Sequence, residues 1–129
     1  MIFLKGKKHI LIVDDVTTNL KCIGEILKTN YSLSMVKSGE QALKTLERVQ
    51  PDLILLDIKM PGMDGFATLD KLRSNEEWMN IPVVLLSADN NEDALKKALE
   101  KGAVSFIKKP FVPQDMIDVI ESIFSQKEQ

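Results

Sequence analysis

The sequence has few of the residues that form disulfides, soft metal sites or membrane spans. Its 129 residues include one cysteine, one histidine, one tryptophan and one tyrosine. Cys22 cannot form a disulfide within the chain and gives no support to a cysteine-based metal site, so we expect a buried thiol in a reducing compartment. No apolar run approaches the roughly 20 residues of a membrane span, and the apolar start is too short for a signal peptide. We expect a cytoplasmic protein with no membrane contact.

Charge and composition narrow the class of protein further. A formal net charge of -2 gives no electrostatic reason to expect nucleic acid as a direct ligand. The content of 44% hydrophobic and 28% charged residues is that of an ordinary globular protein. Because the sequence contains neither a low-complexity stretch nor a Gly/Ser-rich linker, residues 1–129 are predicted to be one domain with its core at about 8–124.

Short apolar runs alternate with segments of helical period. The runs are short and rich in branched aliphatics, which favours strands at residues 9–13, 31–36, 53–56, 83–86 and 104–107. After each run, apolar residues recur on one helical face: Leu20, Ile23 and Leu27; Ala42, Leu43 and Leu46; Phe66 and Leu69; Leu95, Ala98 and Leu99; Ile117, Ile120 and Phe124. Such repeats predict an α/β fold of the doubly wound (βα)5 kind, with a parallel sheet and helices on both faces.

The apolar patterns also indicate the strand order. The runs within 10–13, 53–56 and 83–86 are unbroken, as in strands buried on both faces, whereas 31–36 alternates and 104–107 contains a serine. The latter two therefore lie at the edges, and the predicted order is 2-1-3-4-5. In this order ligands bind beyond the carboxyl ends of the first and third strands, where the chain reverses direction.

Residues that commonly start or end helices support the predicted helix boundaries. Ser38 followed by Gln41 predicts a capping box, Asp64 a helix cap, Gly102 a helix end and Pro113 a first helical position.

Polar residues follow the strands at this one edge. Asp14 and Asp15 follow the first strand, Asp57 the third and Ser87 the fourth, and a lysine pair follows the fifth. Three neighbouring carboxylates repel one another by roughly 4 kcal/mol per pair at 4 Å, and a divalent cation removes the conflict. All-oxygen ligands favour Mg²⁺. An aspartate in such a site can attack an activated phosphoryl group and form an acyl phosphate.

These residues resemble the motifs of the response-regulator receiver family (CheY-like) of two-component signalling. The resemblance covers essentially the whole chain, and its motifs are Ile12-Val13-Asp14-Asp15, the stretch DIKMPGMDG at 57–65, Ser87-Ala88 and Lys109-Pro110-Phe111. Receiver domains are known examples of the order 2-1-3-4-5, so the strand order above agrees with a known pattern.

The resemblance implies a role for each acidic residue. Asp57 would be the phosphoacceptor. Asp15, Asp57 and the backbone carbonyl of Lys59 would bind Mg²⁺ directly, and Asp14 would act through a metal-bound water. The chain would catalyse only its own phosphorylation and dephosphorylation, so it would be a phosphorelay signalling protein and not a metabolic enzyme.

Further roles follow from the same resemblance. Ser87 would hydrogen-bond the phosphoryl group and Lys109 would pair with it, because the family places its lysine directly before a proline; strand alternation allows only one of Lys108 and Lys109 to reach the site. The same resemblance raises the expectation that the Lys109–Pro110 bond is cis. Phe106 stands at the switching aromatic, where tyrosine is commoner, and Val16 stands where the family often has an acidic residue.

The resemblance also implies partners for the chain. The donor would be a sensor histidine kinase or a phosphotransfer protein, and the output either a downstream effector protein or an output domain outside this chain. Phosphorylation would switch the surface of the fourth helix, fifth strand and fifth helix.

Three alternatives are a receiver-shaped binding module that is never phosphorylated, a haloacid-dehalogenase-type phosphatase and a flavin-binding protein. Adjacent Asp14 and Asp15 argue against the phosphatase, and carboxylates in the first loop argue against a flavin phosphate.

Overall fold

Strands and helices alternate along the described part of the chain. The computed structural model describes residues 7–59, 62–87 and 92–127. The elements are β1 (His9–Val13), α1 (Thr17–Leu27), β2 (Ser32–Val36), α2 (Gly39–Leu46), β3 (Leu53–Asp57), α3 (Gly65–Arg73), β4 (Val83–Ser87), α4 (Glu92–Glu100), β5 (Ser105–Lys108) and α5 (Pro113–Lys127). The predicted α/β alternation is confirmed.

β1 lies where it was predicted, and the boundaries of the other strands differ from the prediction by one residue. β3 and β4 each continue one residue further than expected, through Asp57 and Ser87. A polar side chain does not end a strand whose main chain still pairs, and here Asp57 pairs with Leu86 and Ser87 with Lys108. The sheet ladder therefore reaches into the polar edge.

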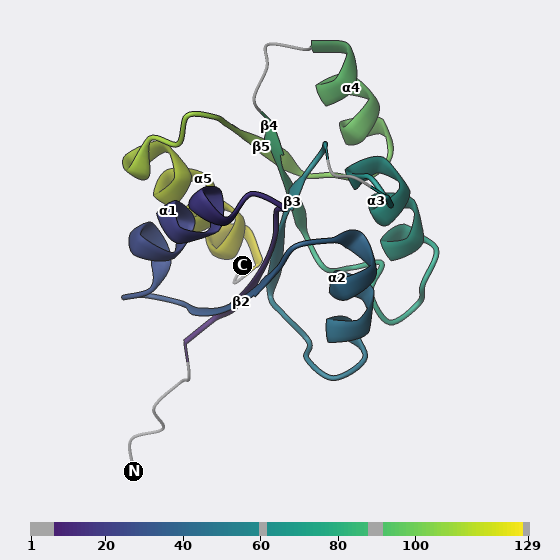
Figure 1. The fold of residues 1–129 in the computed structure, drawn as a ribbon, viewed down its shortest axis with the longest axis horizontal. Helices are drawn as coiled ribbons and strands as arrows, with labels where there is room; N and C mark the ends of the chain where they lie inside the picture. The colour runs from purple at the N-terminus through teal and green to yellow at the C-terminus, as the bar shows by residue number, and fades with distance from the viewer. Residues whose placement is uncertain (1–6, 60–61, 88–91, 128–129) are drawn as a thin grey trace.

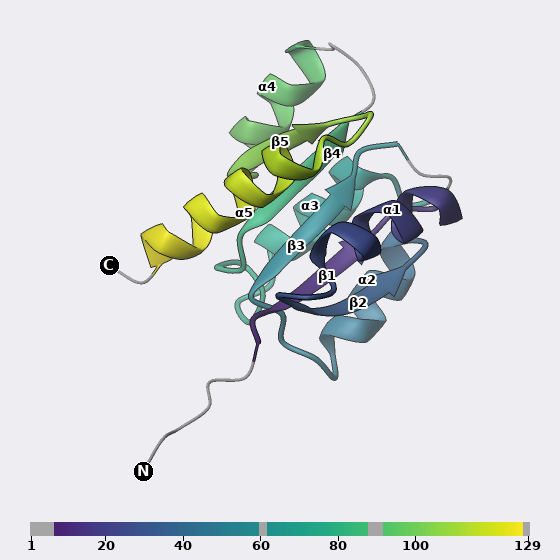
Figure 2. The same cartoon turned by 90° about the vertical axis from the view of Figure 1, so that its left-hand side faces the viewer.

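All five strands of the sheet are parallel and lie in the order β2-β1-β3-β4-β5, as predicted; Figure 2 labels each of them (Figures 1 and 2). β3 is buried along its whole length, whereas the edge strand β2 has no fully buried residue. The unbroken apolar runs thus belong to strands that are buried on both faces. The alternating run belongs to a strand that is covered on one face.

The helices form one layer on each face of the sheet, α1 and α5 on one side and α2, α3 and α4 on the other (Figures 1 and 2). Alternate strand residues point to opposite layers. Leu11, Ile54 and Leu85 pack with the three-helix layer, and Ile10, Leu53 and Val84 pack with α1 and α5.

Two predicted core positions are wrong. Cys22 is exposed, because α1 turns Leu20, Ile23 and Leu27 inward and places Cys22 on its outer side. Leu99 is 45% exposed, since α4 buries only Leu95 and Ala98. The expectation for Cys22 rested on residue type alone. The expectation for Leu99 rested on helical spacing, which predicted the centre of the buried face but not its width.

The predicted helix ends are confirmed. The Ser38 hydroxyl accepts a hydrogen bond from the Gln41 amide at 3.1 Å, and the Asp64 carboxylate accepts one from the Ala67 amide at 2.8 Å. Gly102 follows α4 with φ +106°, a conformation that favours glycine, and Pro113 opens α5. Within the described ranges, none of the helices is long and apolar enough to cross a membrane.

Substituting Leu55 should show how much stability the central strand supplies. Leu55 is 0% exposed in β3, so Leu55→Ala is expected to lower the free energy of unfolding by about 3 kcal/mol in urea denaturation. The matched control is Leu99→Ala, which removes the same atoms from an exposed site and should change stability by less than about 0.5 kcal/mol. Equal effects of the two substitutions would contradict this description of the core.

Candidate functional site

The register of the parallel strands brings the predicted acidic residues together. Val13 of β1 pairs with Leu56 of β3, so the residues that follow the two strands, Asp14 and Asp57, lie side by side. Asp14, Asp15 and Asp57 each offer a carboxylate oxygen, and these oxygens lie within 4.8 Å of one another. The acidic cluster that the sequence predicts is therefore present.

Asp57 lies at the centre of this cluster and is 4% exposed. Its Oδ1 is 3.2 Å from Nζ of Lys109 and accepts a longer hydrogen bond, 3.4 Å, from the backbone amide of Lys59. One ammonium and one amide thus face one oxygen of a buried carboxylate.

Asp14 is fully buried, and its two oxygens have different partners. Oδ1 accepts a hydrogen bond from the Val16 amide at 2.9 Å. Oδ2 accepts one from Nδ2 of Asn19 at 3.1 Å and lies 3.5 Å from Nζ of Lys109. Sequence reasoning assigned no role to Asn19. The available signal was its place in the first turn of α1, from which a short amide can reach back to the preceding loop.

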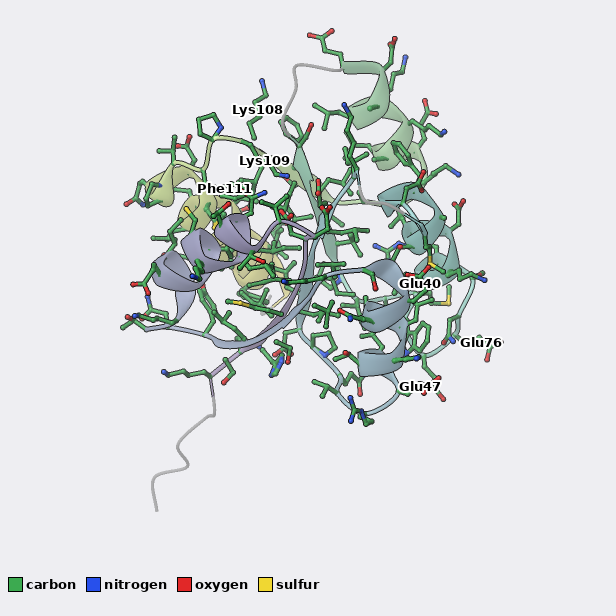
Figure 3. The ribbon with its side chains drawn as sticks, in the orientation of Figure 1. Glu40, Glu47, Glu76, Lys108, Lys109 and Phe111 are labelled. Atoms are coloured by element: carbon green, nitrogen blue, oxygen red, sulfur yellow. The ribbon has the colours of Figure 1, made fainter. Side chains whose placement is uncertain are left out.

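The structure distinguishes the two lysines as predicted. Lys109 contacts both Asp57 and Asp14, and its backbone amide donates to the Ser87 carbonyl at 2.7 Å. Lys108 points outward, whereas Lys109 is directed in over the end of the sheet (Figure 3). The Lys109–Pro110 bond is cis, as expected.

The other predicted site residues lie close to this edge. Ser87 ends β4 and is 6% exposed. Phe106 lies in β5, pairs with Leu85 and packs partly buried on the core of the three-helix layer. From the motifs quoted above, Met60, Pro61 and Ala88 lie outside the described residues.

A glycine lets α3 begin directly beside the phosphoacceptor candidate. The Gly65 amide donates to the Ile58 carbonyl at 2.9 Å. A Cβ at this position would collide with the backbone of Asp57 and Ile58. The close approach of α3 to the end of β3 therefore requires glycine.

The site carries more negative than positive charge. Burial raises the pKa of the Asp57 carboxyl above its ordinary value, the charge of Asp14 raises it further, and Lys109 partly offsets both. When ionised, the three carboxylates exceed the single ammonium of Lys109. The cluster offers oxygen ligands and neither imidazole nor thiolate, a donor set that suits a hard divalent cation such as Mg²⁺. The residues therefore fit a Mg²⁺ ion.

Removing the Asp57 charge should stabilise the metal-free protein. Because its pKa is raised by folding, the folded state binds the Asp57 proton more tightly than the unfolded chain, so this contribution to stability falls as pH rises above the ordinary value of 3.8. In EDTA at neutral pH, Asp57→Asn is expected to raise the thermal midpoint by a few degrees. The gain should shrink as the pH is lowered toward about 4.

Circular dichroism melting curves across this pH range test the prediction. Glu76→Gln is the control, because Glu76 is exposed and lies far from this edge (Figure 3). A lower midpoint for Asp57→Asn at neutral pH would show that the carboxylate stabilises the fold.

Comparison with known proteins gives a consistent assignment. The family model for the response regulator receiver domain matches residues 10–121. The chain is 39% identical over 103 residues to the response regulator PleD of Caulobacter vibrioides, covering 79% of this chain and 23% of PleD. It is 36% identical to the two-component response regulator ORR3 of Oryza sativa subsp. indica, covering 84% of each. The chain thus spans about a quarter of the one relative and most of the other.

One solved structure that is similar to this chain contains a metal ion. The chain is similar to the receiver domain of the sensor histidine kinase PA1611 from Pseudomonas aeruginosa PAO1, with a TM-score of 0.83, 26% identity and coverage of 91% of this chain and 97% of that chain. That structure holds a magnesium ion coordinated in its active-site cleft.

Asp14, Asp15 and Asp57 form an acidic pocket typical of a Mg²⁺-dependent phosphoacceptor, on a fold that matches receivers along most of its length. Such a protein is a signalling module and not a metabolic enzyme. The chain belongs to the response regulator receiver domain family of two-component systems.

Proposed function

We propose that Asp57 accepts a phosphoryl group from a phosphohistidine on a sensor histidine kinase or a phosphotransfer protein, in the presence of Mg²⁺. The observation that carries this proposal is the position of the Asp57 carboxylate. It ends the central strand, lies within 4.8 Å of Asp14 and Asp15, and has the Lys109 ammonium 3.2 Å away. In this proposal one pocket supplies the nucleophile, the metal ligands and the counter-charge.

Each acidic residue has a separate role in holding the metal. Asp15, which is half-buried, and Asp57 would bind Mg²⁺ directly with the backbone carbonyl of Lys59, while buried Asp14 would act through a metal-bound water. When bound, Mg²⁺ would neutralise oxygens of the incoming phosphoryl group. This division agrees with the contacts of Asp14, whose two oxygens already accept hydrogen bonds from the Val16 amide and from Asn19.

The transfer step needs no further cofactor. An oxygen of the Asp57 carboxylate forms a bond to phosphorus as the bond from phosphorus to the donor imidazole nitrogen breaks, and the imidazole leaves with the electron pair. Lys109 pairs with the transferred group from the position where it now contacts Asp57. Ser87, at the end of the adjacent strand β4, donates a hydrogen bond to the same group.

Phosphorylation would act on the surface of α4, β5 and α5. Phe106 lies in β5, and its ring is partly buried against the core. Drawing Ser87 toward Asp57 would free space for the ring to move inward, which changes the surface offered to a downstream effector or an output domain. The ring has no hydroxyl, so packing alone would distinguish the two states.

The chain as a whole would work as a single receiver module. Its similarity to ORR3 over most of both chains supports a protein that acts as a receiver alone. Its similarity to a quarter of PleD supports a receiver within a longer regulator. Both arrangements use the same phosphorylation site.

Labelling with a radioactive phosphoryl donor tests the assignment of Asp57. Acetyl phosphate or a histidine kinase with Mg²⁺ should label the wild type and not Asp57→Asn. The matched control is Asp52→Asn, because Asp52 lies at the other end of β3, where it accepts a hydrogen bond from the His9 amide. Labelling of Asp57→Asn to the wild-type level would disprove the assignment. A wild type that binds Mg²⁺ but is never labelled would favour the unphosphorylated binding module.

Mg²⁺ should stabilise the folded chain through the same carboxylates. An ion that binds only the folded state adds about 2.7 kcal/mol at a concentration one hundred times its dissociation constant. We expect Mg²⁺ to raise the thermal midpoint of the wild type, EDTA to reverse the rise, and Asp15→Asn to abolish most of it. Glu76→Gln, with an exposed carboxylate removed, should respond as the wild type does. An undiminished response of Asp15→Asn would remove Asp15 from the ligand set.

A further inference from the structure

Asn19 reaches from α1 into the acidic pocket. α1 begins at Thr17, so Asn19 is the third residue of its first turn. Its Nδ2 donates a hydrogen bond to Oδ2 of Asp14 at 3.1 Å, and Asp14 itself is completely buried. A polar side chain of the first helix therefore contacts a carboxylate of the site directly.

This contact fixes the second oxygen of Asp14. The Val16 amide already holds Oδ1 at 2.9 Å, and with both oxygens held the carboxylate has one orientation. Lys109 lies 3.5 Å from the same Oδ2 and 3.2 Å from Asp57. Without the amide of Asn19, Oδ2 would be free to turn toward Lys109 and to compete with Asp57 for its charge.

Helix stability does not explain asparagine at this position. A side chain three residues into a helix commonly reaches back to the backbone amide of the capping residue, and glutamate or glutamine does this best. Here the cap is Val16, which makes no side-chain cap bond, and Asn19 donates to the Asp14 carboxylate instead. Asparagine is also a weak helix former, costing about 0.5 kcal/mol relative to alanine.

We propose that Asn19 is a positioning residue for the Mg²⁺ site, acting through Asp14. The inference rests on the proposed binding of Mg²⁺ and deepens it by assigning a residue that sets the affinity. Asn19 keeps Asp14 in the orientation that holds a metal-bound water, and it leaves Lys109 paired chiefly with Asp57. Removing the hydrogen-bond partner of a direct metal ligand typically lowers metal affinity by roughly 10- to 100-fold. Because Asp14 would act through a metal-bound water, we expect the effect of Asn19 at the lower end of this range.

Titration of Mg²⁺ into the full chain, followed by calorimetry, tests the proposal with three variants. Asn19→Leu keeps the approximate shape and removes the donor, and it should weaken Mg²⁺ binding by about tenfold. Asn19→Gln keeps an amide donor and should recover most of the affinity. Thr18→Val is the matched control: Thr18 is exposed in the same helical turn and should bind Mg²⁺ as the wild type does.

The thermal midpoint in EDTA separates positioning from a general structural role. Positioning predicts a loss of affinity in Asn19→Leu that Asn19→Gln restores, at a midpoint close to that of the wild type. Wild-type affinity in Asn19→Leu would overturn the inference and leave the proposed function intact. Equal losses in the leucine and glutamine variants would also overturn it. A wild-type chain that binds no Mg²⁺ would instead disprove the proposed function.

Discussion

The burial of two carboxylates side by side is the constraint around which the rest of this structure is arranged. Asp14 is 0% exposed and Asp57 is 4% exposed. Burial and mutual repulsion raise the pKa of Asp57, and the one ammonium of Lys109 offsets the conflict only in part. A fold selected for stability alone has no reason to keep such a pair. The proposed Mg²⁺ ion would supply the positive charge that this pair lacks, and it would also hold the proposed phosphoryl group.

The hydrophobic sheet makes this unfavourable arrangement possible. β3 and β4 are buried along their whole length, and their ladder continues through Asp57 and Ser87. The backbone of the polar residues is therefore fixed by strands whose apolar side chains pack in both helix layers. Because the register sets which strand ends are neighbours, carboxylates 43 residues apart in sequence, at 14 and 57, meet without any local motif that joins them.

Much of this could be predicted from the sequence, because burial on one or two faces leaves a visible pattern in a strand. Unbroken runs predicted the inner strands, and their order placed Asp14, Asp15 and Asp57 together. Helices carry a weaker signal at the borders of their buried face, so Leu99 was misplaced, and residue type alone misplaced Cys22. The contact between Asn19 and Asp14 could not be predicted, since it depends on how closely the first turn of α1 approaches the loop after β1.

The two ends of the sheet are held by different forces. At the end opposite the acidic pocket, Arg73 donates hydrogen bonds to the carbonyls of Met79, Ile81 and Gly102 at 2.8 to 3.2 Å. These bonds tie α3 to the segments that precede β4 and β5, and they involve no carboxylate partner. At the pocket the Lys109 ammonium forms ion pairs with Asp57 and with Asp14, so a change of charge on Asp57 acts directly on one of these pairs. The proposed phosphorylation of Asp57 would therefore act first at the pocket, at the end of the sheet away from the Arg73 hydrogen bonds.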